Sequence, residues 1–208
     1  MTSLDNRQYF PCFDELPLVD EFMDPQYYQD IGGGTMLPLK HWCYIAEIMD
    51  DSLSHMADFF HRVEVRDLTG HCNSVLFSPD QHMEYAQLRR GATVFVRYAA
   101  KAYFSDLMTQ VIKVDDCCYV KVISRSIDDL LMLSHWYFSG RSCCSACRAP
   151  LSGGAAAQCS SCEVAQYCSG ECLQRHLQEH SQHCGLCKEL MEVINVDMDR
   201  FIQPVPFR

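Results

Sequence analysis

The sequence predicts a mainly β N-terminal domain followed by a small, α-helical, cysteine-rich module. The first part of this prediction rests on short apolar runs with strand-like alternation between residues 42 and 123, separated by turn residues. The second rests on paired cysteines and histidines concentrated between residues 144 and 184. With 208 residues, of which 48% are hydrophobic, the chain is long enough for a domain of about a hundred residues and one small module.

Residues 1–38 are predicted to form an acidic, aromatic N-terminal arm. Its only basic residue is Arg7, and prolines together with Gly32–Gly34 interrupt any regular helix or strand. Six aromatic residues are interleaved with the acidic ones: Tyr9, Phe10, Phe13, Phe22, Tyr27 and Tyr28. Two interpretations follow. The arm either docks on a partner, or lies across its own domain with its aromatic rings buried.

Residues 39–124 are predicted to form the β domain. The turn Asp67–Gly70 joins two of the expected strands into a hairpin, and residues 79–90 suggest a short helix. The expected strands are Trp42–Met49, Arg62–Arg66, His71–Ser78, Ala92–Ala99 and Gln110–Val114, with Tyr119–Ile123 as a continuation or a sixth strand. Three strands, a helix and two more strands are the layout of a five-stranded OB-like Greek-key barrel, although SH3-like barrels and sandwiches give similar patterns.

Two helical segments flank the cysteine-rich module. Ser126 and Asp129 can cap a linker helix within residues 125–142. Residues 185–208 are predicted to form a C-terminal helix, with apolar residues at helical spacing from Leu186, and a tail. The Pro204-Val205-Pro206 sequence of this tail resembles a ligand of proline-reading surfaces.

The cysteine-rich module is predicted at residues 143–184. Four Cys/His pairs define it, each with two or three residues between its members. They are Cys144 and Cys147, Cys159 and Cys162, Cys168 and Cys172, and His180 and Cys184. Two side chains at this spacing can reach one tetrahedral ion, and thiolates with an imidazole suit zinc. A disulfide-rich module would need an oxidising compartment, and we expect none because the chain shows no signal peptide. The sequence therefore predicts two zinc ions per chain.

The spacing of these pairs, with the aromatic-Cys step Tyr167-Cys168, resembles the MYND zinc finger. The resemblance implies interleaved ligation. The first zinc would take Cys144, Cys147, Cys168 and Cys172, and the second Cys159, Cys162, His180 and Cys184. Sites with four protein ligands leave no position for water, so both would be structural. Cys143 remains an alternative to Cys144, and His176 and His183 remain alternatives to His180.

A second, looser resemblance covers residues 40–184. The run from Leu88 to Ala99, followed by Tyr103-Phe104 and Val120–Ile123, resembles the N-terminal half of small fungal MYND-type proteins.

The MYND resemblance also implies a protein-binding role, in several relatives through a groove that takes short proline-containing peptides. The Gln and Trp that usually lie at this groove are replaced by Leu173 and Leu177, which casts doubt on proline-peptide recognition. These leucines either form an apolar contact surface for a partner or pack within the chain. We therefore expect a non-enzymatic, intracellular adaptor of the nucleus or cytoplasm that binds a partner protein.

The alternative function is binding of single-stranded nucleic acid by the OB-like barrel, with the finger recruiting a protein. Its candidate residues are Arg97, Lys101, Tyr103 and Phe104. A net charge of −10 disfavours a surface that attracts phosphates. A SET-type methyltransferase is also disfavoured, because no Asn-His pair occurs. No membrane span is expected, because no apolar run is long enough.

Overall fold

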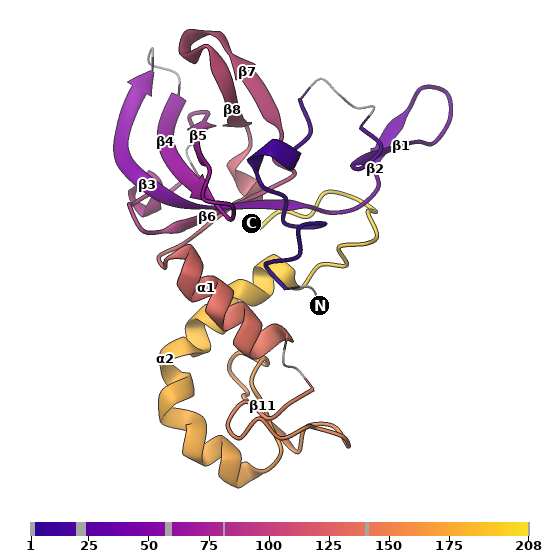
Figure 1. Ribbon diagram of the computed structural model, residues 1–208, viewed down its shortest axis with the longest axis vertical. Coiled ribbons are helices and arrows are strands. Elements are labelled where there is room, and N and C mark those ends of the chain that lie inside the picture. The colour runs from indigo at the N-terminus through magenta and orange to yellow at the C-terminus, as the bar shows by residue number, and fades with distance from the viewer. Residues whose placement is uncertain (1–2, 20–23, 57–59, 81, 140–141, 208) are drawn as a thin grey trace. The chain divides into compact units, whose positions relative to one another are not determined.

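The computed structural model describes residues 3–19, 24–56, 60–80, 82–139 and 142–207, and the chain divides into two compact units (Figure 1). Residues 5–127 and 197–208 form the β unit, and residues 1–4 and 128–196 form the cysteine-rich unit. Phe22, one of the six aromatic residues of the arm, lies outside the described residues, as do Asp20 and Glu21.

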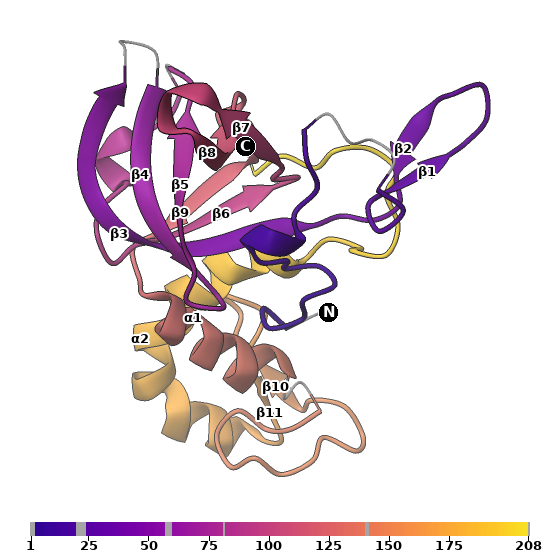
Figure 2. The same cartoon turned by 45° about the horizontal axis from the view of Figure 1, so that its top comes forward.

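The β unit is built on a seven-stranded sheet with the order β7-β8-β5-β4-β3-β6-β9 (Figures 1 and 2). Neighbouring strands are antiparallel except β5 and β8, which run parallel. The strands are β3 (Cys43–Met56), β4 (Phe60–Asp67), β5 (Cys72–Phe77), β6 (Thr93–Arg97), β7 (Lys101–Phe104), β8 (Thr109–Val114) and β9 (Val120–Ile123).

This sheet differs from the expected five-stranded barrel in strand number and in closure. The sheet is not closed, because β7 and β9 lie at its two edges. Strand β7 escapes a sequence pattern because it has four residues and starts with a lysine. A 3-10 turn at Cys117–Tyr119 separates β9 from β8, so the segment expected as a continuation or a sixth strand is a strand of its own on the opposite edge.

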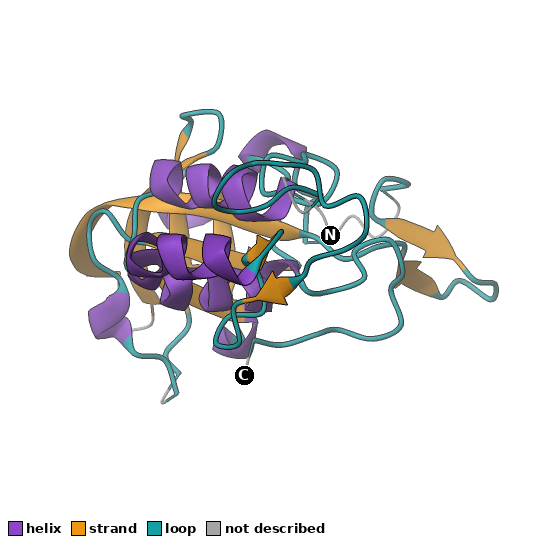
Figure 3. Cartoon of the chain, turned by 90° about the horizontal axis from the view of Figure 1, so that it is seen from below, coloured by secondary structure: helices purple, strands orange, loops and turns teal. Residues whose placement is uncertain are grey.

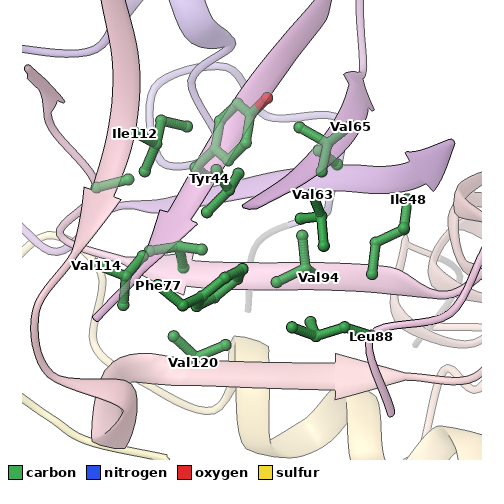
Figure 4. Close-up of a cluster of buried hydrophobic side chains, with 14 of the residues drawn as sticks. Tyr44, Ile48, Val63, Val65, Phe77, Leu88, Val94, Ile112, Val114 and Val120 are labelled. Carbon is green, nitrogen blue, oxygen red and sulfur yellow. The ribbon is translucent and has the colours of Figure 1, made fainter. Parts of the chain in front are cut away.

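The apolar residues of these strands meet in one core (Figure 4). Strand β4 alternates partly buried and buried residues, as its sequence predicts, whereas every residue of β6 is buried. Tyr44, Val65, Phe77 and Ile112 are each completely buried. Burial on this scale, at roughly 1.5–3 kcal/mol per large side chain, stabilises the unit that carries the tail described below.

The predicted turn after β4 is held by one carboxylate. Asp67 accepts hydrogen bonds from the backbone amides of Thr69 (2.9 Å) and His71 (3.1 Å), and Gly70 adopts φ +85°. Asp67 also accepts the amide of Phe13 at 3.0 Å, which ties the arm to the hairpin.

The N-terminal arm is packed on its own unit. Phe10, Phe13 and Tyr27 are buried, and β1 (Tyr28–Asp30) pairs with β2 (Met36–Pro38) in a hairpin. The arm also covers the edge of the sheet, since the amide of Lys101 in β7 donates to the carbonyl of Pro17 at 2.8 Å. These contacts favour the interpretation in which the arm lies across its own domain.

The short helix expected at residues 79–90 is only a 3-10 turn at Tyr85–Gln87. The hydroxyl of Tyr85 accepts the amide of Asp80 at 2.8 Å and donates to the carbonyl of Ser78 at 3.0 Å. The side chain therefore replaces helical hydrogen bonds in holding this loop.

The cysteine-rich unit contains two helices and a two-stranded ladder. Helix α1 (Ile127–Leu133) continues into a π-helical turn at Ser134–Ser139, and β10 (Ala157–Gln158) pairs with β11 (Gln166–Tyr167). Helix α2 (Gly170–Ile194) is one helix of 25 residues, where the sequence had suggested a separate C-terminal helix. Gly185 does not interrupt it, because a single glycine costs a helix only about 1 kcal/mol. None of the helices in the described residues is long and apolar enough to cross a bilayer.

Candidate metal centre

Two turns of the same design present the first and second cysteine pairs. In the first, the amide of Arg148 donates to the carbonyl of Cys144 at 2.9 Å, and in the second the amide of Glu163 donates to the carbonyl of Cys159 at 2.9 Å. Arg148 (φ +62°) and Glu163 (φ +56°) both adopt the left-handed conformation that side chains usually avoid. Each turn thereby points two sulfurs to one side of the chain.

The third pair lies where β11 passes into α2. Ser169 caps the helix, because its hydroxyl accepts the amide of Cys172 at 3.2 Å. The first turn is attached to β11 through Ser145, whose amide donates to the carbonyl of Gln166 at 2.7 Å. The cysteines at 144 and 147 are thus brought to the start of α2, where Cys168 and Cys172 lie.

The fourth pair lies one turn apart on α2. His180 and Cys184 occupy positions i and i+4, which share one face of a helix. Strand β10 leads directly to Cys159 and pairs with β11, and the sulfurs of Cys159 and Cys184 lie 3.7 Å apart, so the second turn reaches this later part of the helix. The β10–β11 ladder therefore interleaves the two sets of ligands.

The structure gathers two clusters of four side chains. Within each cluster the donor atoms lie within 4.8 Å of one another. The first contains Cys144, Cys147, Cys168 and Cys172, and the second contains Cys159, Cys162, His180 and Cys184. No third group of this kind occurs among the residues that the structure describes.

The spacing of the donor atoms fits zinc. The Sγ atoms of Cys168 and Cys172 are 3.5 Å apart, those of Cys159 and Cys184 are 3.7 Å apart, and Nε2 of His180 lies 3.4 Å from Sγ of Cys162. Sulfurs at about 2.3 Å from a common tetrahedral ion are separated by about 3.8 Å. A disulfide would need about 2.05 Å. The two clusters fit two zinc ions, each with a full set of protein ligands.

The electrostatics of the sulfurs also call for a cation. Burial opposes ionisation of Cys144, but the amides of Cys147, Cys168 and Ala146 lower its pKa to about 6. In the same cluster, hydrogen bonds with Cys172, Cys147 and Cys144 raise the pKa of Cys168 to about 12. One sulfur ionises at the expense of the others unless a positive ion lies between them.

Two buried residues support the second cluster from outside. The hydroxyl of Tyr137 lies 3.4 Å from Nδ1 of His180, so Nδ1 can carry the ring proton while Nε2 faces the metal. The thiol of Cys187, which is 0% exposed, hydrogen-bonds Cys162, and this is the largest cause that lowers the pKa of Cys162 to about 3. Nothing in the sequence pattern marks Tyr137 or Cys187 as a support of the metal site.

The alternative ligands lie outside the clusters. Cys143 pairs through its backbone with Pro150, whereas the sulfur of Cys144 joins the first cluster. His176 is buried with its Nδ1 at 3.2 Å from the hydroxyl of Tyr167, and His183 belongs to neither cluster.

Comparison with protein families agrees with this arrangement. Residues 144–184 match the MYND finger. The match begins at the first ligand of one cluster and ends at the last ligand of the other, so the MYND finger of this chain is the segment that both clusters hold. A comparison of the chain with curated proteins finds no match.

The remaining candidates are not members of the metal clusters. On α2, Leu173 is half-buried and Leu177 is 55% exposed. In the β unit, Arg97 is buried, and Lys101 donates its Nζ to the carbonyl of Asp14 at 2.9 Å. Tyr103 is exposed, while the neighbouring Phe104 packs edge-on against Phe60.

Proposed function

We propose that the MYND finger is a zinc-built docking module and that the chain is a non-enzymatic adaptor that binds a partner protein through it. MYND fingers in general mediate protein–protein interactions. The closed ligand sets support a structural role for both ions, because no coordination position remains for water or substrate.

The observation that carries the proposal is the exposed leucine on the metal-bound helix. Leu177 is 55% exposed and lies between the ligands Cys172 and His180, on a part of α2 that both ions fix in place. Leu173 lies one turn earlier on the same face and is half-buried. A rigid, exposed apolar side chain of this kind suits a small protein contact, because metal binding has already ordered the helix that carries it.

The test compares Leu177→Glu with Gln178→Glu. Gln178 is the next residue of α2 and is exposed, but it points about 100° away around the helix, so it controls for added charge. Both zinc-loaded variants and the unchanged chain are used to capture proteins from extracts of the source cells, with and without nuclease treatment. We expect one set of captured proteins to be lost with Leu177→Glu and kept with Gln178→Glu.

Equal capture by both variants would place the contact elsewhere, and capture that disappears only on nuclease treatment would favour the alternative of single-stranded nucleic acid. That alternative stays a prediction for Arg97, Lys101, Tyr103 and Phe104. The OB-like interpretation of the β unit also stays a prediction. It is supported by the contiguous strands β8-β5-β4-β3-β6, in which only β5 and β8 run parallel.

A further inference from the structure

Residues 197–207 form a tail that is bound along the β unit. The tail contains no helix or strand, and it runs as a long loop toward the β1–β2 hairpin before it turns back to the sheet (Figures 1 and 3). Its first anchor is the carbonyl of Met198, which accepts the amide of His41 at 2.9 Å. The ring of Phe201 then packs against His41, with 5.0 Å between ring centroids.

Two side chains of the β unit clamp the backbone of the tail. Nε2 of His41 lies 3.1 Å from the carbonyl of Arg200, and the hydroxyl of Tyr98 accepts the amide of Val205 at 2.9 Å. Tyr98 and Nδ1 of His41 also hydrogen-bond each other. Because burial lowers the pKa of His41, its ring is neutral, with Nε2 donating to Arg200 and Nδ1 accepting from Tyr98. One hydrogen-bonded chain therefore holds both ends of the loop.

Arg97 contacts the last described residues of the tail. Its Nη1 donates to the carbonyls of Val205 (2.8 Å) and Pro206 (3.2 Å), and its guanidinium lies 3.8 Å from the ring centroid of Phe207. The amide of Phe207 in turn donates to the carbonyl of Cys118 at 2.8 Å. Arg97 is only 6% exposed, so it is fixed in position to make these contacts.

The sequence pattern of the tail matches this hydrogen-bond pattern. Val205 and Phe207 supply the two amides that bind the β unit, and the alternating residues Pro204 and Pro206 have no amide to satisfy. Both prolines face solvent, where they hold the backbone extended at little entropic cost. The bound segment is therefore of the Pro-x-Pro-aromatic type and is held through its backbone and through the ring of Phe207.

The tail leaves part of its binding surface unfilled. A cavity of about 310 Å³ lies in the β unit, and Phe201 and Pro204 of the tail form part of its wall. Trp42, Tyr98 and Tyr119 contribute aromatic walls, and Asp116 contributes an acidic group. Aromatic walls beside a bound proline segment are the usual features of surfaces that recognise extended proline-containing peptides.

The binding surface also stores backbone strain while the tail itself is loosely packed. Tyr98 adopts φ +56°, an uncommon conformation for a bulky residue and one that is found at binding sites. Between the two clamps, Ile202 is 73% exposed, and Gln203 and Pro204 are exposed as well. A segment with so little burial opens at low free-energy cost, so it can be exchanged.

We propose that the surface formed by His41, Arg97 and Tyr98 is a docking site for an extended Pro-x-Pro-aromatic segment of a partner protein, and that Pro204–Phe207 occupies this site in cis as a competing ligand. The partner segment binds when the tail leaves. This site lies wholly within the β unit and is separate from Leu177 of the MYND finger.

The test measures the binding of a fluorescein-labelled Gln-Pro-Val-Pro-Phe peptide to the full, zinc-loaded chain by fluorescence anisotropy. The unchanged chain should bind weakly, because a tethered tail competes at an effective concentration in the millimolar range. Phe207→Ala removes the ring under Arg97 and should tighten peptide binding by about tenfold or more. Adding Tyr98→Phe, which keeps the ring and removes the hydroxyl, should weaken it again by about fivefold.

Three controls keep the result specific. Ile202→Ala alters an exposed tail residue between the clamps and should bind as the unchanged chain does. Leu177→Glu should also bind normally, which separates this site from the finger. A peptide with Ala in place of Phe should not bind. Circular dichroism and a zinc content of two ions per chain establish that each variant is folded.

Three results would overturn the proposal. If the peptide binds neither chain up to millimolar concentration, the surface is not a docking site. Equal binding to the unchanged chain and to Phe207→Ala would show that the tail does not compete. A dimer that becomes a monomer on Phe207→Ala would show that the tail of a second copy occupies the site, rather than the tail in cis.

Discussion

The two metal clusters of the MYND finger share one local design but differ in their surroundings. Both begin with a turn that ends in a left-handed residue, and both finish on α2. In the first cluster Cys147 and Cys168 are exposed, whereas in the second Cys162 is 4% and His180 is 1% exposed. The second cluster also has Tyr137 and Cys187 around it. The first site therefore has two ligands that are open to solvent, whereas the second has two buried ligands with a packed shell around them.

The largest expected effect comes from removing one ligand of each cluster. Cys162→Ser should release the second ion and unfold most of α2, because binding energy of about 10–16 kcal/mol in such sites is also folding energy. Cys147→Ser should release the first ion and leave the later turns of α2 folded. Zinc content by mass spectrometry and helix content by circular dichroism measure both. The same loss of helix in both variants would contradict the contrast.

Chelation should separate the two ions in time. With excess chelator, we expect two phases of zinc release. The faster phase belongs to the first cluster, where two thiolates are open to solvent. A coloured zinc indicator follows the release, and Cys147→Ser should lack the fast phase. A single phase in the unchanged chain would show that exposure does not control release.

A smaller effect is expected from the shell of the second cluster. Tyr137→Phe removes the partner of His180 Nδ1 and should weaken zinc binding at the second cluster about 10- to 100-fold. Competition with a chelator of known affinity measures this. The matched control is Tyr167→Phe, because the Tyr167 hydroxyl contacts His176, which belongs to neither cluster. Equal effects of the two variants would show that the hydroxyl of Tyr137 has no special role in zinc binding.

The smallest expected effect concerns the two left-handed turns. Glu163→Gly relieves a backbone conformation that costs roughly 1 kcal/mol, and it should slow hydrogen exchange of amides 159–165 in the zinc-loaded chain. Arg148→Gly relieves the same strain but also removes the hydrogen bond of Arg148 to the carbonyl of Trp136 (3.1 Å) and its stacking on that ring. We therefore expect little net change there, and equal gains at both turns would be evidence against a stabilising role for the Arg148 side chain.

The clusters can be predicted from sequence because each pair is local, with only two or three residues between its ligands. The residues around the clusters cannot be predicted from the sequence. Tyr137 contacts His180, 43 residues further along the chain, and no motif near Tyr137 marks it. The strands β3 to β6 follow from short apolar runs, from the alternation in β4 and from the Asp67–Gly70 turn, whereas the four-residue β7 is too short for a pattern. The sequence suggested a separate C-terminal helix, but α2 runs on through Gly185, because packing outweighs the weak preference of a single glycine.

The length of α2 gives the metal ions an influence beyond the finger. The helix spans about 37 Å at about 1.5 Å per residue, and its last ligand, Cys184, leaves the ten residues to Ile194 without any metal contact. A helix of ten residues is marginal in water when it stands alone. In this chain Leu190 and Val193 are buried, so packing and the zinc-bound half together keep these residues helical. Because one helix carries both the ligands and this packed end, a change at the metal sites is transmitted to residues three turns beyond the last ligand.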